Sequence, residues 1–211
     1  MPSGSIPNSF IVSLYFSLTH CLIPLIGLFA GSLGASYFFA LRTLIIGSHS
    51  LLLACHLPSL AAALYLATFH KEKNTISLSK KLLLGLIPLT CMVLFNLHPV
   101  GNQAFTYSFF WFIPLATLLV PHNNLFFHMI GSTFTAHAVG SILWLYGGLI
   151  PDPQTWVHLI PVVALERLFF ASGMYVGYTI IRKIAHFRLT ARYNPSSQNY
   201  VGSLGVSGLS R

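Results

Sequence analysis

Acidic residues are almost absent from this chain: its 211 residues include only Glu72, Asp152 and Glu166, against eleven Lys and Arg. Charged residues of both signs make up 7% of the chain, whereas a soluble domain carries about 25%. So few charges cannot cover a soluble fold with polar surface, and the long apolar runs are typical of a polytopic membrane protein. The sequence therefore predicts an all-α fold embedded in a membrane.

Several kinds of catalytic site are also missing from the sequence. Three acidic residues provide no paired carboxylates of the glycosidase type, and neither a GxSxG motif nor a nucleophile–base pair at recognisable spacing is present. A Walker-type phosphate loop is missing as well, so the chain cannot power transport by itself. We therefore expect a protein that is not an enzyme.

Cysteine is scarce too. Cys21, Cys55 and Cys91 are widely spaced and each lies inside an apolar run, which allows neither a disulfide framework nor a CxxC metal site. The ten histidines include no HExxH or HxH motif, but a haem held by one histidine on each of two helices remains an alternative. We expect small buried thiols, no metal and no cofactor.

The net charge of +8 is carried by two basic clusters, at residues 71–81 and 182–192. Both clusters flank apolar segments and do not follow one amphipathic face, which favours membrane orientation over nucleic-acid binding. Under the positive-inside rule both clusters are cytoplasmic.

A membrane span needs about 20 apolar residues, and the hydropathy pattern predicts six spans. Two spans before Lys71 place the N-terminus in the cytoplasm and Arg42 in an outer loop. The start of the chain lacks the positive region of a signal peptide, so we expect the first apolar run to be retained. The expected organisation is one domain, residues 1–192, with cytoplasmic termini and a flexible polar tail, residues 193–211. The predicted spans are residues 9–38, 44–69, 82–98, 104–121, 124–149 and 156–181.

Glu166 and Arg167 lie in the middle of the last predicted span, where a charge costs about 2.5–3.5 kcal/mol. Helical periodicity puts Glu166 on one stripe with Gly173 and Gly177, a GxxxG pair that permits close helix packing. We therefore expect Glu166 to face the protein interior. Adjacent helical residues do not face each other, so we expect each charge to find a partner on another helix or on a solute.

Polar residues recur every four positions in the segment GSTFTAHAVGS, residues 131–141. Ser132, Ala136 and Gly140 form one row, predicted to pack closely against another helix. A polar row beside it contains His137, which is our expected partner for Glu166. Aromatic and polar residues near the outer loops complete the predicted solute site, with an interfacial aromatic belt as the alternative. The predicted binding residues are Glu166, Arg167, His137, Asp152, Trp111, Trp144, Trp156, Asn102 and Gln103.

With about 200 residues, six predicted spans, few charges and aromatic residues near the outer loops, the chain resembles the substrate-binding S-component family of energy-coupling factor importers. The row Gly27, Gly31, Ala35 is a loose counterpart of that family's AxxxA coupling motif in the first span. The resemblance implies a vitamin-like solute held near the outer side. It also implies two partners, a transmembrane scaffold and a cytoplasmic ATPase, and a location in a bacterial-type inner membrane.

Three hypotheses of function follow. The first is a membrane component that binds a small solute and takes it up with help from energising subunits. The second is a scaffold or assembly protein without transport, in which Glu166 and Arg167 are structural. The third is a haem-bearing redox protein.

Overall fold

The computed structural model describes residues 6–46, 50–69 and 77–192; Glu72, most of the first basic cluster and the tail predicted at 193–211 lie outside them. All regular structure in the described residues is helical, as predicted, without a strand. The elements in chain order are α1 (Ile6–Ile46), α2 (Ser50–Ala67), α3 (Leu78–Leu97), α4 (Pro99–Gln103), the 3-10 helix η1 (Phe105–Trp111), α5 (Phe112–Thr117), α6 (Leu125–Tyr146) and α7 (Pro153–Arg192).

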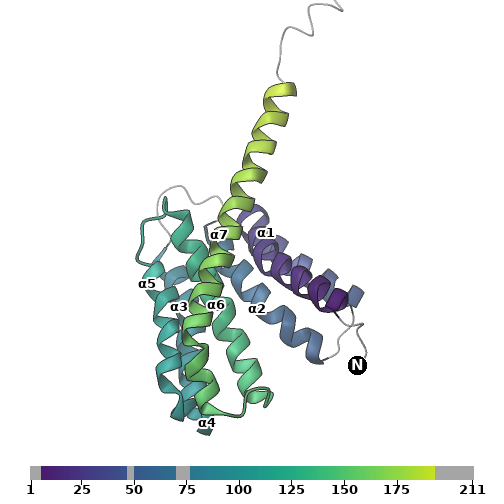
Figure 1. Ribbon diagram of the computed structural model, residues 1–211. Helices are drawn as coiled ribbons and strands as arrows, with labels where there is room; N and C mark the ends of the chain where they lie inside the picture. The colour runs from purple at the N-terminus through teal and green to yellow at the C-terminus, as the bar shows by residue number, and fades with distance from the viewer. Residues whose placement is uncertain (1–5, 47–49, 70–76, 193–211) are drawn as a thin grey trace, which may run out of the picture. The chain divides into compact units, whose positions relative to one another are not determined.

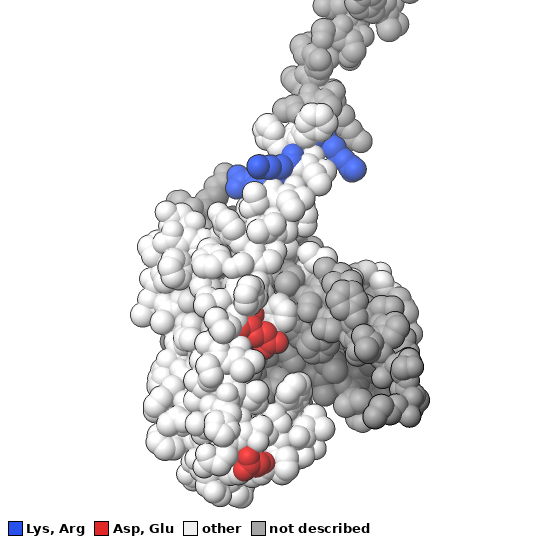
Figure 2. Space-filling view, in the orientation of Figure 1, with Lys and Arg blue, Asp and Glu red and all other residues white. Residues whose placement is uncertain are grey.

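The chain divides into two compact units, Met1–Tyr175 and Val176–Arg211, and the division falls within α7. In the first unit α1 packs against α2, α2 packs against α6, and α6 contacts both α3 and α5 (Figure 1). The short helix α4 lies at one end of α3 (Figure 1). The second unit consists, where it is described, of the C-terminal part of α7, along which Lys and Arg gather (Figure 2).

Three segments of the described residues are long and apolar enough to cross a membrane: Leu22–Leu44, Leu78–Leu97 and Pro153–Arg188. Large apolar side chains on these helices are exposed, for example Leu82 on α3 and Phe169 on α7. An extended exposed apolar surface is unfavourable in water and is typical of helices that contact lipid. The chain is therefore a multi-pass membrane protein.

The N-terminal third differs from the predicted pair of spans. The element α1, residues 6–46, consists of two helical segments that meet at a kink at Gly31, whose φ of 71° lies in the left-handed region that favours glycine. Arg42, predicted in an outer loop, lies in the last turns of this helix, so that prediction is wrong. The kink also removes Gly31 from any regular Gly27–Gly31–Ala35 row.

The segment predicted as one span at 104–121 is also different, because it contains η1 followed by α5. Pro114 has no N–H to donate to Phe110, which accounts for the loss of regular α-helix just before it. Seven residues of 3-10 helix and six of α-helix rise together about 23 Å. That is less than the ~30 Å hydrocarbon core, so the prediction of one regular α-helix across the membrane here is wrong, and a crossing at this segment has to include the residues that flank the two short helices.

An aromatic cluster holds α3, η1 and α7 together within the first unit. The ring of Phe95, which is fully buried, lies 5.6 Å from Tyr107, 5.2 Å from Trp111 and 5.3 Å from Trp156, measured between centroids. Aromatic pairs at these separations contribute about 0.5–1.5 kcal/mol each beyond the burial of apolar area. This cluster fixes the start of α7 and positions the site described next.

Candidate functional site

A cavity of about 350 Å³ lies in the first unit among α2, η1, α6, the loop after α6 and the first half of α7. Its volume is in the range of small-molecule sites, about 300–1,000 Å³. Most of its wall is apolar or aromatic, and a few polar groups converge on it. The lining residues are Pro58, Tyr107, Ala136, His137, Gly140, Ser141, Trp144, Ile150, Trp156, Leu159, Val162, Val163, Glu166 and Arg167.

The residues that α7 contributes to this cavity follow helical spacing. Trp156, Leu159, Val163 and Glu166 are three or four positions apart, so they line one face of the helix over about three turns. Trp156 is almost fully buried, and its indole N–H donates to the carbonyl oxygen of Ile150 at 3.1 Å. This hydrogen bond ties the loop after α6 to the cavity wall.

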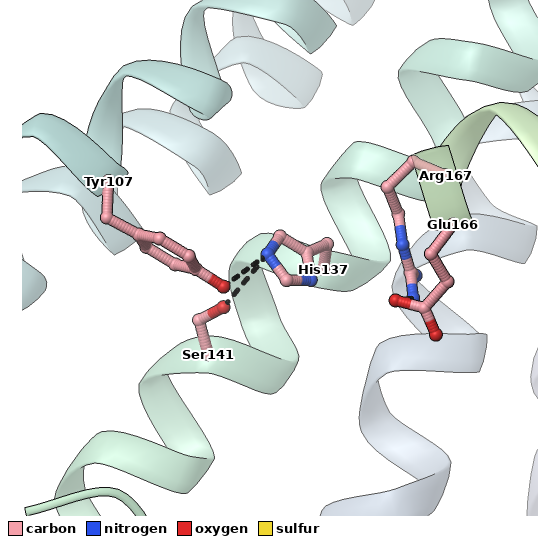
Figure 3. A network of polar contacts seen from close by, with 5 residues as sticks. All are labelled: Tyr107, His137, Ser141, Glu166 and Arg167. Atoms are coloured by element: carbon pink, nitrogen blue, oxygen red, sulfur yellow. Dashed lines mark hydrogen bonds and ion pairs between the residues drawn. The ribbon is translucent and has the colours of Figure 1, made fainter. Parts of the chain in front are cut away.

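The two charged residues of the cavity pair with each other. Nη2 of Arg167 lies 2.7 Å from Oε2 of Glu166 (Figure 3). Arg167 also places its guanidinium carbon 4.7 Å from the centre of the Phe170 ring, a cation–π contact. The expectation that each charge finds its partner on another helix is therefore wrong for this pair. Long side chains can bend toward each other even where their Cβ atoms diverge by 100°.

The buried face of α7 is also not the one predicted. Arg167 is 8% exposed at its side chain, whereas Glu166 is 42% exposed. Arg167 shares its face with Phe170, Ala171 and Met174, all buried, because these residues lie three, four and seven positions further on. Glu166, predicted to face the interior, lines the cavity but is partly exposed, and Arg167 is the more deeply buried of the two. Large apolar side chains, not the small glycines, define the packed face.

Polar side chains from η1 and α6 meet on the other side of the cavity. A hydrogen bond of 2.7 Å joins Oη of Tyr107 to Nε2 of His137, and Oγ of Ser141 lies 3.4 Å from the same nitrogen (Figure 3). The sequence predicts Glu166 as the partner of His137. In the structure His137 pairs with Tyr107 instead, so that prediction is wrong. The histidine ring stands between Tyr107 and the Glu166–Arg167 pair, so it presents its other edge to the ion pair (Figure 3).

The row Ser132, Ala136, Gly140 packs against α2, as predicted for a close-packing row. Ser132 donates a hydrogen bond to the carbonyl oxygen of Ala62 at 2.9 Å, and a Cβ at Gly140 would lie 3.5 Å from Pro58. A closer approach occurs at Gly27 on α1, where a Cβ would lie 1.8 Å from the carbonyl oxygen of Ala63. These small residues serve packing within the chain.

Five of the nine predicted binding residues line the cavity, namely Glu166, Arg167, His137, Trp144 and Trp156. The structure does not bring the other four to it. Trp111 is fully buried in the aromatic cluster, and Asn102 and Gln103 are exposed on α4. Asp152 is exposed before α7, where its Oδ2 accepts hydrogen bonds from the backbone N–H and the hydroxyl of Thr155. That is the geometry of a helix N-cap.

Sequence reasoning omitted Tyr107 and Ser141 from the predicted site. Ser141 follows His137 by four residues, so the polar row on α6 was a usable signal. Tyr107 is 30 residues from His137 along the chain, and only the folding of η1 onto α6 joins them. The apolar lining residues Leu159 and Val163 could have been found by stepping three or four positions back from Glu166.

A second hollow, of about 680 Å³, lies among α1, α2 and α3. Its walls are largely leucine, isoleucine and alanine, and Leu83 and Leu86 on its rim are exposed. Its lining residues include no acidic side chain and no aromatic ring, whereas the smaller cavity contains both. The described residues also contain no group of three His, Cys, Asp or Glu side chains that could hold a metal ion. The smaller cavity is therefore the candidate site.

Comparison of the chain with protein-family models, with curated proteins and with solved structures finds no match. The class of protein shown by the fold is a multi-pass helical membrane protein. Its function has to be argued from the cavity.

Proposed function

We propose that this protein binds a small solute inside the membrane and takes it up with help from energising partner subunits. The observation that carries the proposal is the cavity of about 350 Å³ that contains an ion pair at its wall. A charge at membrane depth is costly, and such residues generally serve a solute or ion pathway. Trp144 and Trp156 supply flat apolar surface, and Glu166 and Arg167 supply groups that can fix orientation.

The arrangement in the membrane is part of the same proposal. Six crossings with both termini in the cytoplasm, the fourth made by η1 and α5 with the residues that flank them, place the two basic clusters on one side. The loop at residues 147–152, whose Ile150 lines the cavity, then lies on the other side. The resemblance to the S-components of energy-coupling factor importers implies two partners, a transmembrane scaffold and a cytoplasmic ATPase. It also supplies the location, a bacterial-type inner membrane, and a vitamin-like solute.

A scaffold without transport is the competing proposal. It would use rows of small residues to bind another subunit, but Gly27 and Ser132 are already in contact with Ala63 and Ala62 of this chain. Those rows are therefore occupied within the protein. This observation favours solute binding over the scaffold.

The test is native mass spectrometry of the protein purified in detergent. We expect a retained small molecule on the wild type. The variant Gly140→Leu fills the cavity from α6 and should lose that mass, whereas Gly140→Ala is the matched control and should retain it. A Cβ at position 140 is in ordinary contact with Pro58, so Gly140→Ala should fold, and thermal melting checks that Gly140→Leu is folded as well.

Two results would count against the proposal. A retained molecule that survives Gly140→Leu with unchanged occupancy would lie elsewhere on the protein. Protein subunits bound without any small molecule would favour the scaffold.

A further inference from the structure

The charges that line the cavity cancel. Among its fourteen lining residues, Glu166 is the single acid and Arg167 the single Lys or Arg, and their charged atoms lie 2.7 Å apart. The hydroxyls of Tyr107 and Ser141 carry no formal charge at neutral pH, and His137, which pairs with Tyr107, adds none when its ring is neutral. Any solute in this cavity therefore meets a wall whose carboxylate and guanidinium already neutralise each other.

The absence of net charge on the cavity wall limits which solutes can bind. A solute with a net charge would bring into the membrane interior a charge that the wall does not compensate, and an uncompensated charge in a medium of low polarity is strongly disfavoured. A solute without net charge incurs no such cost and leaves the Glu166–Arg167 pair intact. The cavity should therefore disfavour anionic and cationic solutes alike.

The ion pair still has hydrogen-bonding capacity. Nε of Arg167 is buried and has no hydrogen-bond partner among the residues that the structure describes, and Arg167 lines the cavity, so this N–H remains for an acceptor there. The carboxylate of Glu166 lines the cavity and is partly exposed, so it can accept from a donor. A polar group that carries a donor and an acceptor side by side, such as an amide, matches both.

The apolar part of the cavity wall indicates which kind of molecule fits next to the ion pair. Trp144, Trp156, Leu159 and Val162 present aromatic and aliphatic surface, and a cavity of about 350 Å³ suits a compact molecule. We propose that the solute is a compact molecule without net charge, with an apolar or aromatic body and one polar end that carries both a hydrogen-bond donor and an acceptor. This inference rests on the proposed function and specifies its substrate class.

The test uses four probes that share an indole ring and differ in charge: tryptamine as a cation, indole-3-acetate as an anion, tryptophan as a zwitterion and indole-3-acetamide as an uncharged amide. Binding is measured by equilibrium dialysis at pH 7.4 against the full-length protein in nanodiscs of phosphatidylcholine, whose zwitterionic headgroups avoid a surface potential that would bias charged probes. We expect tryptophan or indole-3-acetamide to bind at least about tenfold more tightly than either charged probe.

A charge-switch variant separates charge balance from shape. Glu166→Gln retains the size of the side chain but leaves Arg167 as the one formal charge at the cavity. Indole-3-acetate should then gain at least about tenfold in affinity relative to the uncharged probe. Asp152→Asn is the matched control, because it removes the same charge from an exposed residue outside the cavity and should leave the order of the four probes unchanged.

The outcomes separate this inference from the function on which it rests. Tightest binding of tryptamine or indole-3-acetate by the wild type would overturn the inference and leave the solute-binding function standing. The same holds if Glu166→Gln does not change the order of the probes. Absence of binding by all four probes, together with no retained solute in the purified protein, would overturn both.

Discussion

The guanidinium of Arg167 and the carboxylate of Glu166 meet at 2.7 Å although the two residues are neighbours on one helix, and the arginine is the more buried of the two. The guanidinium also lies over the ring of Phe170, and Arg167 shares its face of α7 with the buried residues Ala171 and Met174. A buried cation in a membrane helix is thereby neutralised by its own neighbour. Nε of Arg167 is buried and has no hydrogen-bond partner among the described residues.

Removing the acid of this pair should destabilise the protein. Glu166→Gln leaves the charge of Arg167 buried without its partner, and we expect the free energy of unfolding to fall by about 1–3 kcal/mol, a figure reduced for the partial exposure of Glu166. Denaturation with increasing SDS in mixed micelles measures the change. Asp152→Asn, the same change at an exposed position, should cost clearly less; equal losses would contradict the pairing.

The hydrogen bond between Tyr107 and His137 should contribute to stability. Tyr107→Phe leaves His137 Nε2 with only the 3.4 Å contact to Ser141, and a buried polar group left poorly paired costs about 1–3 kcal/mol. Tyr146→Phe is the control, because the exposed Tyr146 hydroxyl donates to the carbonyl oxygen of Leu94. It should cost about 0.5 kcal/mol or less. Thermal melting of both variants tests this, and an equal loss would count against the interior network.

Gly131 should not tolerate a side chain. A Cβ there would lie 2.1 Å from Oγ1 of Thr117 and 2.4 Å from Oη of Tyr65, two atoms that already hydrogen-bond to each other at 2.7 Å. We expect Gly131→Ala to lower the free energy of unfolding by about 1–3 kcal/mol through overpacking. Gly140→Ala, on the same helix but with its nearest neighbour at 3.5 Å, should have little effect. Thermal melting of the two variants tests this prediction. Indistinguishable melting curves for Gly131→Ala and Gly140→Ala would refute the packing of α6 on α5.

The start of α7 should be sensitive to acid. Hydrogen bonds from the hydroxyl and then the backbone N–H of Thr155 lower the pKa of Asp152 below its usual value. A carboxyl whose pKa is depressed by folding stabilises the protein above its unfolded pKa, and that contribution is lost as the pH falls through the folded pKa. Asp152→Asn retains the cap without the charge, so wild type should be the more stable at pH 7 and the difference should vanish in strong acid. Melting temperatures measured from pH 7 to pH 3 test this; a difference independent of pH would contradict it.

The two ends of α3 should lie on opposite sides of the membrane. In a background without native cysteines, we expect Asn102→Cys to react with an impermeant maleimide in intact cells. Ser77→Cys and Lys183→Cys should react only after the membrane is opened, because the basic clusters orient their ends toward the cytoplasm. All three positions are exposed in the structure. Labelling of Ser77→Cys and Asn102→Cys from the same side would exclude α3 as a span.

The sequence by itself determined the class of the protein. A shortage of charge and long apolar runs are properties of composition, so the helical membrane fold could be predicted without any contact. The break at PHNN, residues 121–124, and the row Ser132, Ala136, Gly140 could also be predicted, because proline chemistry and a four-residue repeat act locally. The Asp152 cap was not predicted, although Asp before Pro with Thr three positions on is an N-terminal helix signal.

Only the tertiary structure decided which groups meet. Helical periodicity places Glu166 and Arg167 100° apart but does not say which of them faces the core. Arg167 is the buried residue because it lies on the same face of α7 as the buried Phe170 and Met174. The pairing of Tyr107 with His137 depends on η1 folding onto α6 across 30 residues of chain. The cavity likewise exists because α2, α6 and α7 pack around it, and such long-range contacts leave no periodic signal in a single sequence.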